Sequence, residues 1–491
     1  RFDHRRRDAI SLLLCITQWI DLGYRDLAFL DSLYHRGFSE AKLTQLPLID
    51  FLKLRLVQGF RCLANEDLEG AISLFDLTLR IGEELMPPPL VFLAHFWKGR
   101  ALRKKGEYEP ALFHIVAART CAHKANAPRL VAVAKIHESW LVFQKGDRRQ
   151  AFNLLDEAEA ELRSTGHALS LGNIESARGR FVRRSGEYAR ALAHFERAIE
   201  IYSVNHMNHP NYARALVNAA YVKRLIALDM QPKMRGGKAR GSAHARYLQI
   251  SEEVFLIDTA ATEIYTMHHH QGGIGSVLVN AGHLHLESGD IDRASNEAQK
   301  AFLFGEDKCD QILMARSRIL QVAIELARSE EQLGEHPDTS LHANLAVQYA
   351  EEAIERATHT QNNRLLAEAY ISRGAAATDE FFQDWETAKE YAAEAATLLG
   401  KDDRDHLFKE LNALKAKILR STGIDQTLRL WSDGQFGNKT FQQIQEEFAE
   451  LVIPKIWINQ GRNVARVAQK LHVSPKKVRR ILSNARYVST Q

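Results

Sequence analysis

The chain has 491 residues, a formal net charge of +4, and ordinary proportions of hydrophobic (45%) and charged (26%) side chains. This composition is typical of folded globular proteins and argues against a disordered chain. No apolar run approaches the roughly 20 residues of a membrane span, and the short apolar stretch from Ala9 to Ile16 is followed by Asp21 and Arg25 rather than by an export cleavage site.

A short motif recurs along the chain at a regular interval. Positions 106–111 read GEYEPA, and related strings occur at 146–151 (GDRRQA) and 186–191 (GEYARA), so the starting positions differ by a period of 40. More distant copies begin at Glu66, Gly289 and Gln383, and 23–28 is a plausible first copy. A fixed period of this length predicts an array of repeated supersecondary units.

The spacing of small residues inside each copy predicts a pair of antiparallel helices. An alanine seven positions after the alanine of the motif lies on the same helix face, and a glycine or serine precedes the motif alanine by twelve positions. Small side chains at both places let two helices approach closely, and the glycine between them makes the turn. The first set is Ala118, Ala158, Ala198, Ala301 and Ala395, and the second is Gly59, Gly99, Ser139, Gly179 and Gly282.

These copies resemble the tetratricopeptide repeat, most closely at 280–294 and 179–198. The usual period of that family is 34, so longer helices are expected here. The resemblance implies an all-α fold over residues 1–420, in which about nine helix pairs stack into a right-handed α-solenoid. It also implies that the concave surface binds a protein or peptide segment.

A basic insertion at 230–242 interrupts the repeats and contains Gly236, Gly237 and Gly241. We expect a loop between the two helices of one repeat, because this glycine content disfavours a helix. A phosphate-binding role is the less favoured alternative, since no preceding strand or GK[ST] sequence supports it. Turn-forming residues then predict a linker at 421–440 before a separate module at 441–491.

The C-terminal segment 451–491 is strongly basic. It contains nine Lys or Arg and no Asp or Glu, whereas the segment 1–450 carries the other 56 of the 65 basic residues and all 61 acidic ones. Within this basic end, Val464, Val467 and Leu471 form one apolar face, and Val478 with Ile481 and Leu482 forms a second. Ser474 followed by Pro475 is a typical helix start. The pattern predicts two short helices with a basic outer face, suited to the DNA major groove. The alternative interpretation is a basic helix end that is simply exposed to solvent and binds nothing.

This end resembles the Fis-type helix-turn-helix found at the C-termini of many bacterial transcription regulators, in which two preceding helices mediate dimerisation. The predicted contacts to double-stranded DNA are Arg462, Arg466, Lys470, Ser474, Lys476, Lys477, Arg479, Arg480 and Arg486. Among them, Lys476, Lys477 and Arg480 are the candidates for base edges or nearby phosphates. Two residues depart from the family pattern: His472 occupies the usual glycine of the turn, and Pro454 is expected to kink or split the preceding helix.

Nothing in the sequence favours catalysis. His268, His269 and His270 are consecutive and cannot converge on one ion from a helix, so a helix end is expected, and His206 and His209 fit an inter-helix loop beside Pro210. Walker, GxSxG and HExxH motifs are absent. The cysteines are far apart and predict buried free thiols in a reducing compartment: Cys15, Cys62, Cys121 and Cys309.

The sequence therefore predicts a cytoplasmic, non-enzymatic DNA-binding regulator without cofactor or metal. Its repeats would dock a protein or peptide, its terminal module would bind an operator, and it could form a homodimer. The alternative is an interaction scaffold or adaptor in a signalling or defence assembly. A third possibility, an enzyme whose catalytic domain precedes Arg1, follows from the absence of an initiating Met.

Overall fold

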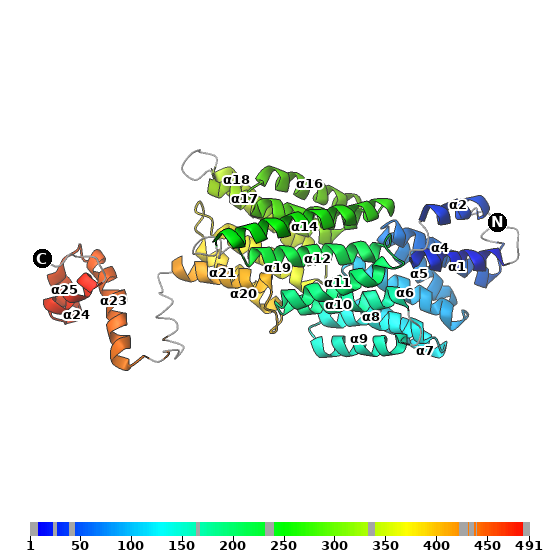
Figure 1. Ribbon diagram of the computed structural model, residues 1–491, viewed down its shortest axis with the longest axis horizontal. Coiled ribbons are helices and arrows are strands. Elements are labelled where there is room, and N and C mark those ends of the chain that lie inside the picture. Colours follow the sequence, from blue (N-terminus) through cyan, green and yellow to red (C-terminus); the bar gives the residue numbers. More distant parts are fainter. Residues whose placement is uncertain are drawn as a thin grey trace. The chain divides into compact units, whose positions relative to one another are not determined.

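The structure is a computed structural model that describes residues 8–22, 27–38, 45–163, 167–230, 240–331, 339–421, 431, 437 and 439–484. The described part contains 22 helices and falls into two compact units, Arg1–Asn412 and Ala413–Gln491 (Figure 1). Each unit has a hydrophobic core of its own.

Helices of the first unit form sequential antiparallel pairs, which is a tetratricopeptide-like arrangement. The pairs are α1 (Ala9–Asp21) with α2 (Leu27–Gly37), α4 (Leu48–Ala64) with α5 (Leu68–Gly82), α6 (Pro88–Lys105) with α7 (Tyr108–Lys124), α8 (Pro128–Gln144) with α9 (Arg148–Leu162), α10 (Ala168–Arg184) with α11 (Tyr188–Ser203), α12 (Pro210–Leu228) with α14 (Arg240–Met267), α15 (Gln271–Glu287) with α16 (Ile291–Asp307), α17 (Gln311–Glu331) with α18 (Thr339–Thr358), and α19 (Asn363–Ala377) with α20 (Trp385–Leu398). Helix α21 (His406–Ser421) follows. The prediction of about nine pairs is confirmed for the described residues.

In four of the nine described pairs the recurring glycine makes the turn between the two helices. Gly106, Gly146, Gly186 and Gly289 have φ values of 94°, 95°, 78° and 87°, in the left-handed region where glycine alone has no steric cost. In several repeats an aspartate directly after this turn caps the second helix; the Asp147 carboxylate, for example, accepts a hydrogen bond from the Gln150 amide. The motif thus ends one helix and starts the next within a few positions.

The predicted small residues lie where paired helices touch. A Cβ atom on Gly99 would lie 2.8 Å from the Ile115 side chain, and one on Gly179 would lie 2.9 Å from the Phe195 ring. The motif alanines from Ala71 onward and the residues seven positions later are buried, whereas Ala28 of the plausible first copy is exposed. Ala346 and Ala353 of α18, where the motif is otherwise weak, are also buried. Close packing inside each pair is therefore the physical reason for the repeat.

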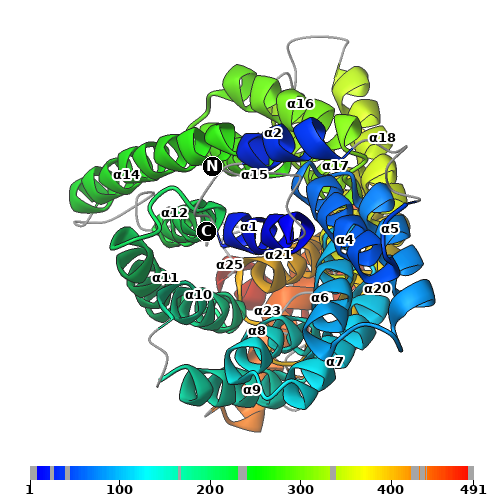
Figure 2. The same ribbon diagram turned by 90° about the vertical axis from the view of Figure 1, so that its right-hand side faces the viewer.

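The repeat array curves so that the first helix of each pair lies on its inner side. Figure 2 shows α6, α8, α10 and α12 inside the curve, with α7, α9, α11 and α14 outside. The curvature brings together segments that are far apart in sequence. The Gln361 amide donates to the Gly106 carbonyl over 2.8 Å, and the Gly272 amide donates to Glu66 over 3.2 Å.

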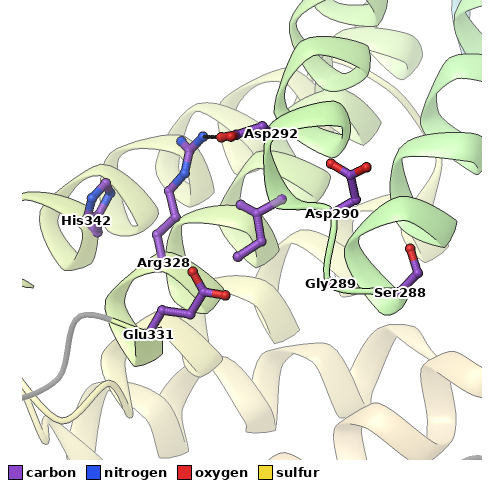
Figure 3. A pocket seen from close by; sticks show the side chains of 8 residues that line it. Ser288, Gly289, Asp290, Asp292, Arg328, Glu331 and His342 are labelled. Carbon is purple, nitrogen blue, oxygen red and sulfur yellow. Dashed lines mark ion pairs between the residues drawn. The ribbon is translucent and has the colours of Figure 1, made fainter.

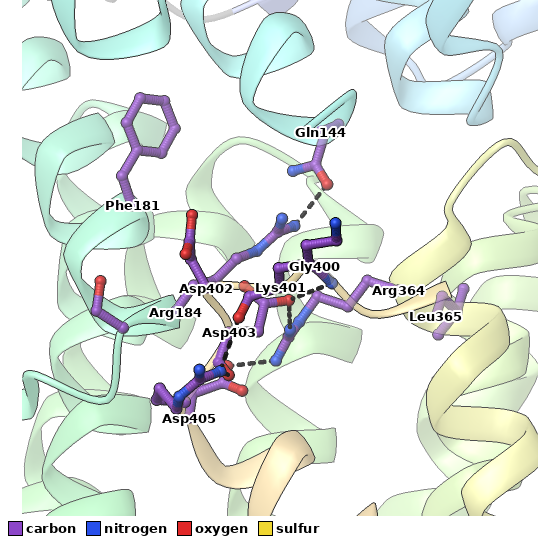
Figure 4. A network of polar contacts seen from close by, with 12 residues as sticks. Gln144, Phe181, Arg184, Arg364, Leu365, Gly400, Lys401, Asp402, Asp403 and Asp405 are labelled. Atoms are coloured by element: carbon purple, nitrogen blue, oxygen red, sulfur yellow. Dashed lines mark hydrogen bonds and ion pairs between the residues drawn. The ribbon is translucent and has the colours of Figure 1, made fainter. Parts of the chain in front are cut away.

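A polar network holds a further long-range contact, between α10 and the connection from α20 to α21 (Figure 4). The Arg364 guanidinium pairs with Asp403, at 3.2 Å, and with Asp405. Because both aspartates lie between α20 and α21, these two ion pairs fix the shape of that connection. That connection then meets the C-terminal end of α10, where the Arg404 amide donates to the Arg184 carbonyl over 2.8 Å. The middle and the end of the first unit are thereby joined.

Three expectations need correction. Residues 240–242 of the predicted loop insertion begin α14, whereas 231–239 lie outside the described residues. Pro454 does not split its helix, because α23 (Phe441–Asn459) continues through it. The four free cysteines are not buried as predicted: Cys15 and Cys309 are exposed, and Cys62 and Cys121 are only partly buried. In the part of the chain that the structure describes, no helix combines the length and apolarity of a membrane span.

Candidate nucleic-acid interface and a cationic inner face

The second unit contains a small three-helix core at the C-terminal end of the chain. Helices α24 (Val464–Leu471) and α25 (Pro475–Asn484) pack against each other and against α23. The residues buried in this core are Ile453, Val467, Ala468, Val478, Ile481 and Leu482. The second predicted apolar face, Val478 with Ile481 and Leu482, is fully included. Of the first, Val467 is buried, and Val464 and Leu471 are partly buried against the same core, as hydrophobic periodicity predicts.

A tight turn joins α24 to α25. His472 adopts the left-handed conformation, with φ 51° and ψ 43°, and the Val473 amide donates to the Ala468 carbonyl over 3.0 Å. This is the pattern with which helices commonly end, usually with glycine at the left-handed position. Ser474 then begins the next helix, because its hydroxyl accepts a hydrogen bond from the Lys477 amide at 3.2 Å.

The cap of the first short helix was not predicted from the sequence. The Asn463 side-chain oxygen accepts hydrogen bonds from the amides of Ala465 (3.0 Å) and Arg466 (3.2 Å). Both short helices therefore have side-chain caps that compensate for their lack of length. The sequence signal for this cap was Asn463, an asparagine directly before a segment with helical apolar periodicity.

The basic residues of this unit lie outside the core. All of the following have exposed side chains: Arg462, Arg466, Lys470, Lys476, Lys477, Arg479 and Arg480. Arg480 lies 3.8 Å from Glu446 of α23, an exposed pair that contributes little. Ser474 is likewise exposed, whereas Arg486 lies outside the described residues. The surface of α24 and α25 is thus strongly cationic, while the core that they form is apolar.

A second cationic feature, which was not predicted from the sequence, lies on the inner helices of the repeat unit. We call it the arginine cluster, and define it as Arg100 and Arg103 of α6, Arg180 of α10, Arg214 of α12, and His137 of α8. Burial, together with repulsion from Arg214, Arg180 and Arg100, lowers the pKa of Arg103 to about 9. Burial and repulsion from Arg214 and Arg183 lower the pKa of Arg180 to about 9 as well. Each of these two guanidinium groups therefore lies in a protein-enclosed, positively charged environment.

Aromatic rings separate and orient these cations. The Arg103 guanidinium lies over the Trp140 ring of α8, 5.3 Å from its centroid, and Arg184 lies over Phe143 of the same helix at 4.6 Å. A signal was present in the sequence, because the string RALRK at 100–104 recurs two repeats later as RFVRR at 180–184. Cationic faces of α6 and α10 thus flank an aromatic face of α8.

The first unit also has a recess of about 560 Å³ between the α15–α16 turn and the ends of α17 and α18 (Figure 3). Its basic side chains, Arg328 and His342, are paired with acidic groups. Arg328 pairs with Asp292 at 3.5 Å and with Glu325 at 2.9 Å, and His342 contacts the same glutamate at 2.6 Å. We assign no ligand to this recess.

The histidines that suggested a metal have structural roles. His268 and His269 follow the end of α14, and His270 caps α15 by accepting from the Gly273 amide at 2.8 Å. His209 caps α12 in the same way, through the Asn211 amide at 2.9 Å. Among the described residues no group of three or more metal-ligating side chains converges.

Comparison with known proteins supports the repeat fold. No family model and no curated protein matches the sequence. The chain is similar to the structure of a Rap protein complexed with competence and sporulation factor, with a TM-score of 0.52, 14% identity, and coverage of 84% of this chain and 99% of that one. The apo form of RapI (TM-score 0.44, 13% identity, 80% and 97% coverage) and the human IFIT1 dimer with m7Gppp-AAAA (0.39, 14%, 89% and 100%) are more distant. At this identity the first likeness shows the fold alone, a tetratricopeptide-like helical repeat.

Proposed function

We propose that this protein is a DNA-binding transcription regulator. In this proposal residues 441–491 form a Fis-type helix-turn-helix that recognises operator DNA, and the helical-repeat domain of residues 1–420 docks a protein or peptide partner. The observation that carries the proposal is the separation of chemistry on α24 and α25: their apolar side chains form the core, whereas all seven described basic side chains between 462 and 480 are exposed.

Helix α25 would read the DNA. Its first turn presents Lys476 and Lys477, and Arg480 follows one turn later on the outer surface. The amino end of a helix attracts phosphate, and Lys or Arg can donate to guanine O6 and N7 in the major groove. Arg462, Arg466 and Lys470 lie before or along α24 and would hold the phosphate backbone, as would Ser474 at the turn.

Support for the partner-docking role comes from the fold. The structure of the similar Rap protein is a complex with competence and sporulation factor. A homodimer is also part of the proposal, since operators are commonly bound by paired modules. Helix α23 offers exposed apolar side chains for such pairing: Phe441 is 74% exposed and Phe448 is 48% exposed.

The test is DNA binding by the full chain, using sequences selected from random DNA and titrated by fluorescence anisotropy at several salt concentrations. We expect replacement of Lys476, Lys477, Arg479 and Arg480 by Gln to weaken binding and to reduce the slope of log K against log salt by about 0.9 for each phosphate that is no longer neutralised. The matched control replaces four exposed basic residues of the repeat unit: Arg149, Arg197, Arg293 and Lys389.

Equal loss of DNA affinity in the two quadruple variants would contradict the proposal, because a general charge effect would then explain the binding. If the terminal variant loses a partner protein while no DNA is selected by the parent chain, the scaffold or adaptor function is favoured instead.

A further inference from the structure

We propose that the arginine cluster is a carboxylate-binding site for an acidic peptide segment on the inner face of the repeat unit. This inference rests on the partner-docking part of the proposed function and specifies its chemistry. The cluster lies on α6, α8, α10 and α12, four successive inner helices (Figure 2), so an extended ligand following the curve would pass its members in order.

The first argument is the lack of internal counter-charge. Within the described residues, no ion pair joins an acidic side chain to Arg103, Arg180 or Arg214, although many charged groups inside the repeat unit have such partners. Glu66, in the turn between α4 and α5, has partners of its own. Glu66 pairs with Lys104, at 3.6 Å, and with His270, at 3.3 Å.

The second argument concerns unmet hydrogen bonds. The Nε atom of Arg180 and the Nδ1 atom of His137 are buried and have no hydrogen-bond partner. The same is true of Nε in Arg183, one turn along α10. A buried N–H group without an acceptor is costly, and an anion that accepts from it would offset that cost. His137 stays uncharged beside the arginines, because burial and their repulsion hold its pKa well below its usual range.

The third argument is that the chain already places one peptide carboxylate at the edge of this cluster. Asp21, the last residue of α1, accepts hydrogen bonds from Arg100 Nη1 at 2.6 and 2.7 Å and from the Trp97 indole at 3.0 Å. This contact shows how an acidic side chain fits between an arginine and an aromatic ring here. Arg103 beside Trp140 repeats the combination of guanidinium and indole without an acid.

The geometry favours a peptide over a compact anion. The cationic side chains are distributed over several helices, and two of them lie over aromatic rings: Arg100 over Phe96 at 5.6 Å and Arg103 over Trp140 at 5.3 Å. Held apart in this way, they match several carboxylates spaced along an extended chain. Planar guanidinium groups bind carboxylates by paired hydrogen bonds, which gives directional recognition.

The experiment uses the full-length chain carrying the Gln substitutions at Lys476, Lys477, Arg479 and Arg480, so that the basic terminal module cannot capture the probe. The probe is a fluorescein-labelled hexaglutamate peptide, with a labelled glycine–serine hexapeptide as the neutral reference. We expect saturable binding of hexaglutamate only, and at least about tenfold weaker binding after Arg103→Gln with Arg180→Gln. The matched control, Arg197→Gln with Arg293→Gln on outer helices, should change affinity less than twofold.

Equal affinity of the two double variants would overturn the site. Displacement of the labelled peptide by inorganic triphosphate at concentrations far below those of unlabelled hexaglutamate would overturn the peptide assignment and indicate a phosphate ligand. Because selected-DNA binding by the Arg103→Gln, Arg180→Gln chain with an intact terminal module should be unchanged, failure here is distinguishable from failure of the DNA-binding proposal.

Discussion

His472 shows how a single residue can be anticipated from its neighbours. The turn between the two short helices needs a left-handed residue, a position that glycine fills most easily. Histidine tolerates this conformation better than most other side chains, and its φ of 51° lies in the expected region. The departure from the usual glycine therefore leaves the turn intact, and Val473 still packs against the core of the second unit.

A buried carboxyl group makes stability depend on pH. Asp258 of α14 is almost fully buried and accepts a hydrogen bond from Asn280 at 3.1 Å. Burial raises the pKa of Asp258 to about 7, whereas an unfolded aspartate titrates near 4. Between these values the folded chain holds a proton that the unfolded chain has lost, so this group lowers stability as pH rises from about 4 to 7, with no further change above.

We therefore expect Asp258→Asn to raise the free energy of unfolding, relative to the parent chain, by on the order of 2 kcal/mol more at pH 8 than at pH 5. Urea unfolding followed by circular dichroism at both pH values measures the difference. Asp292→Asn is the control, because Asp292 is 98% exposed. A stabilisation of equal size at pH 5 and pH 8 would contradict the assignment to the Asp258 carboxyl.

At the scale of helices, the two helices of a pair approach so closely that the residues at their contact must be small. A Cβ atom on Gly179 of α10 would lie 2.9 Å from the ring of Phe195, which is fully buried on α11. Gly179→Val should force these helices apart and lower the free energy of unfolding by roughly 1–3 kcal/mol. Chemical denaturation measures this change.

The control for that substitution is Gly241→Ala. Gly241 also lies in a helix, α14, but no atom is within 4 Å of its added Cβ. Alanine is the better helix former, so stability should stay equal or rise by less than about 1 kcal/mol. If both substitutions destabilise equally, helix propensity rather than inter-helix contact explains the glycine positions.

Much of the helical arrangement could be predicted because it is encoded locally. The turn glycines, the small residues of each pair and the cap at Ser474 all act within one or two helices. Local signals also explain the error at 240–242 and the absence of a split at Pro454. Glycine at 241 disfavours a helix only weakly, so α14 begins at Arg240 despite it. Pro454 removes one backbone hydrogen bond, but the apolar face of α23 packs on the neighbouring helices and the helix continues.

Features of the whole repeat unit could not be predicted from the sequence, because they depend on curvature summed over many repeats. The contact between Gly106 and Gln361 joins α6 to the connection before α19. The arginine cluster is similar in origin: Arg103 and Arg180 are separated by two repeats and come together only on the inner side of the curve. The recurrence of this basic string was visible, but its consequence for charge required the structure. The predicted DNA contacts remain a prediction, although the structure places those that it describes on the exposed surface of the second unit.

The long-range contact between α10 and the α20–α21 connection should depend on Arg364. Its partners Asp403 and Asp405 are 10% and 4% exposed, so Arg364→Ala would remove the ion-pair partner of two buried carboxylates. The expected loss is roughly 3–5 kcal/mol in the free energy of unfolding. Hydrogen exchange should also accelerate at the Arg404 amide, which donates to the Arg184 carbonyl and is protected only while this connection keeps its shape.

Lys409→Ala is the matched control, because Lys409 also bridges distant segments, pairing with Asp229 at 2.7 Å, but both side chains are about half exposed. Its loss should cost no more than about 1 kcal/mol. Adding Asp405→Asn to Arg364→Ala should restore part of the stability, since it removes the most deeply buried of the stranded charges. Equal losses for Arg364→Ala and Lys409→Ala, with no recovery in the double variant, would mean that backbone contacts rather than this buried ion pair hold the curved repeat unit together.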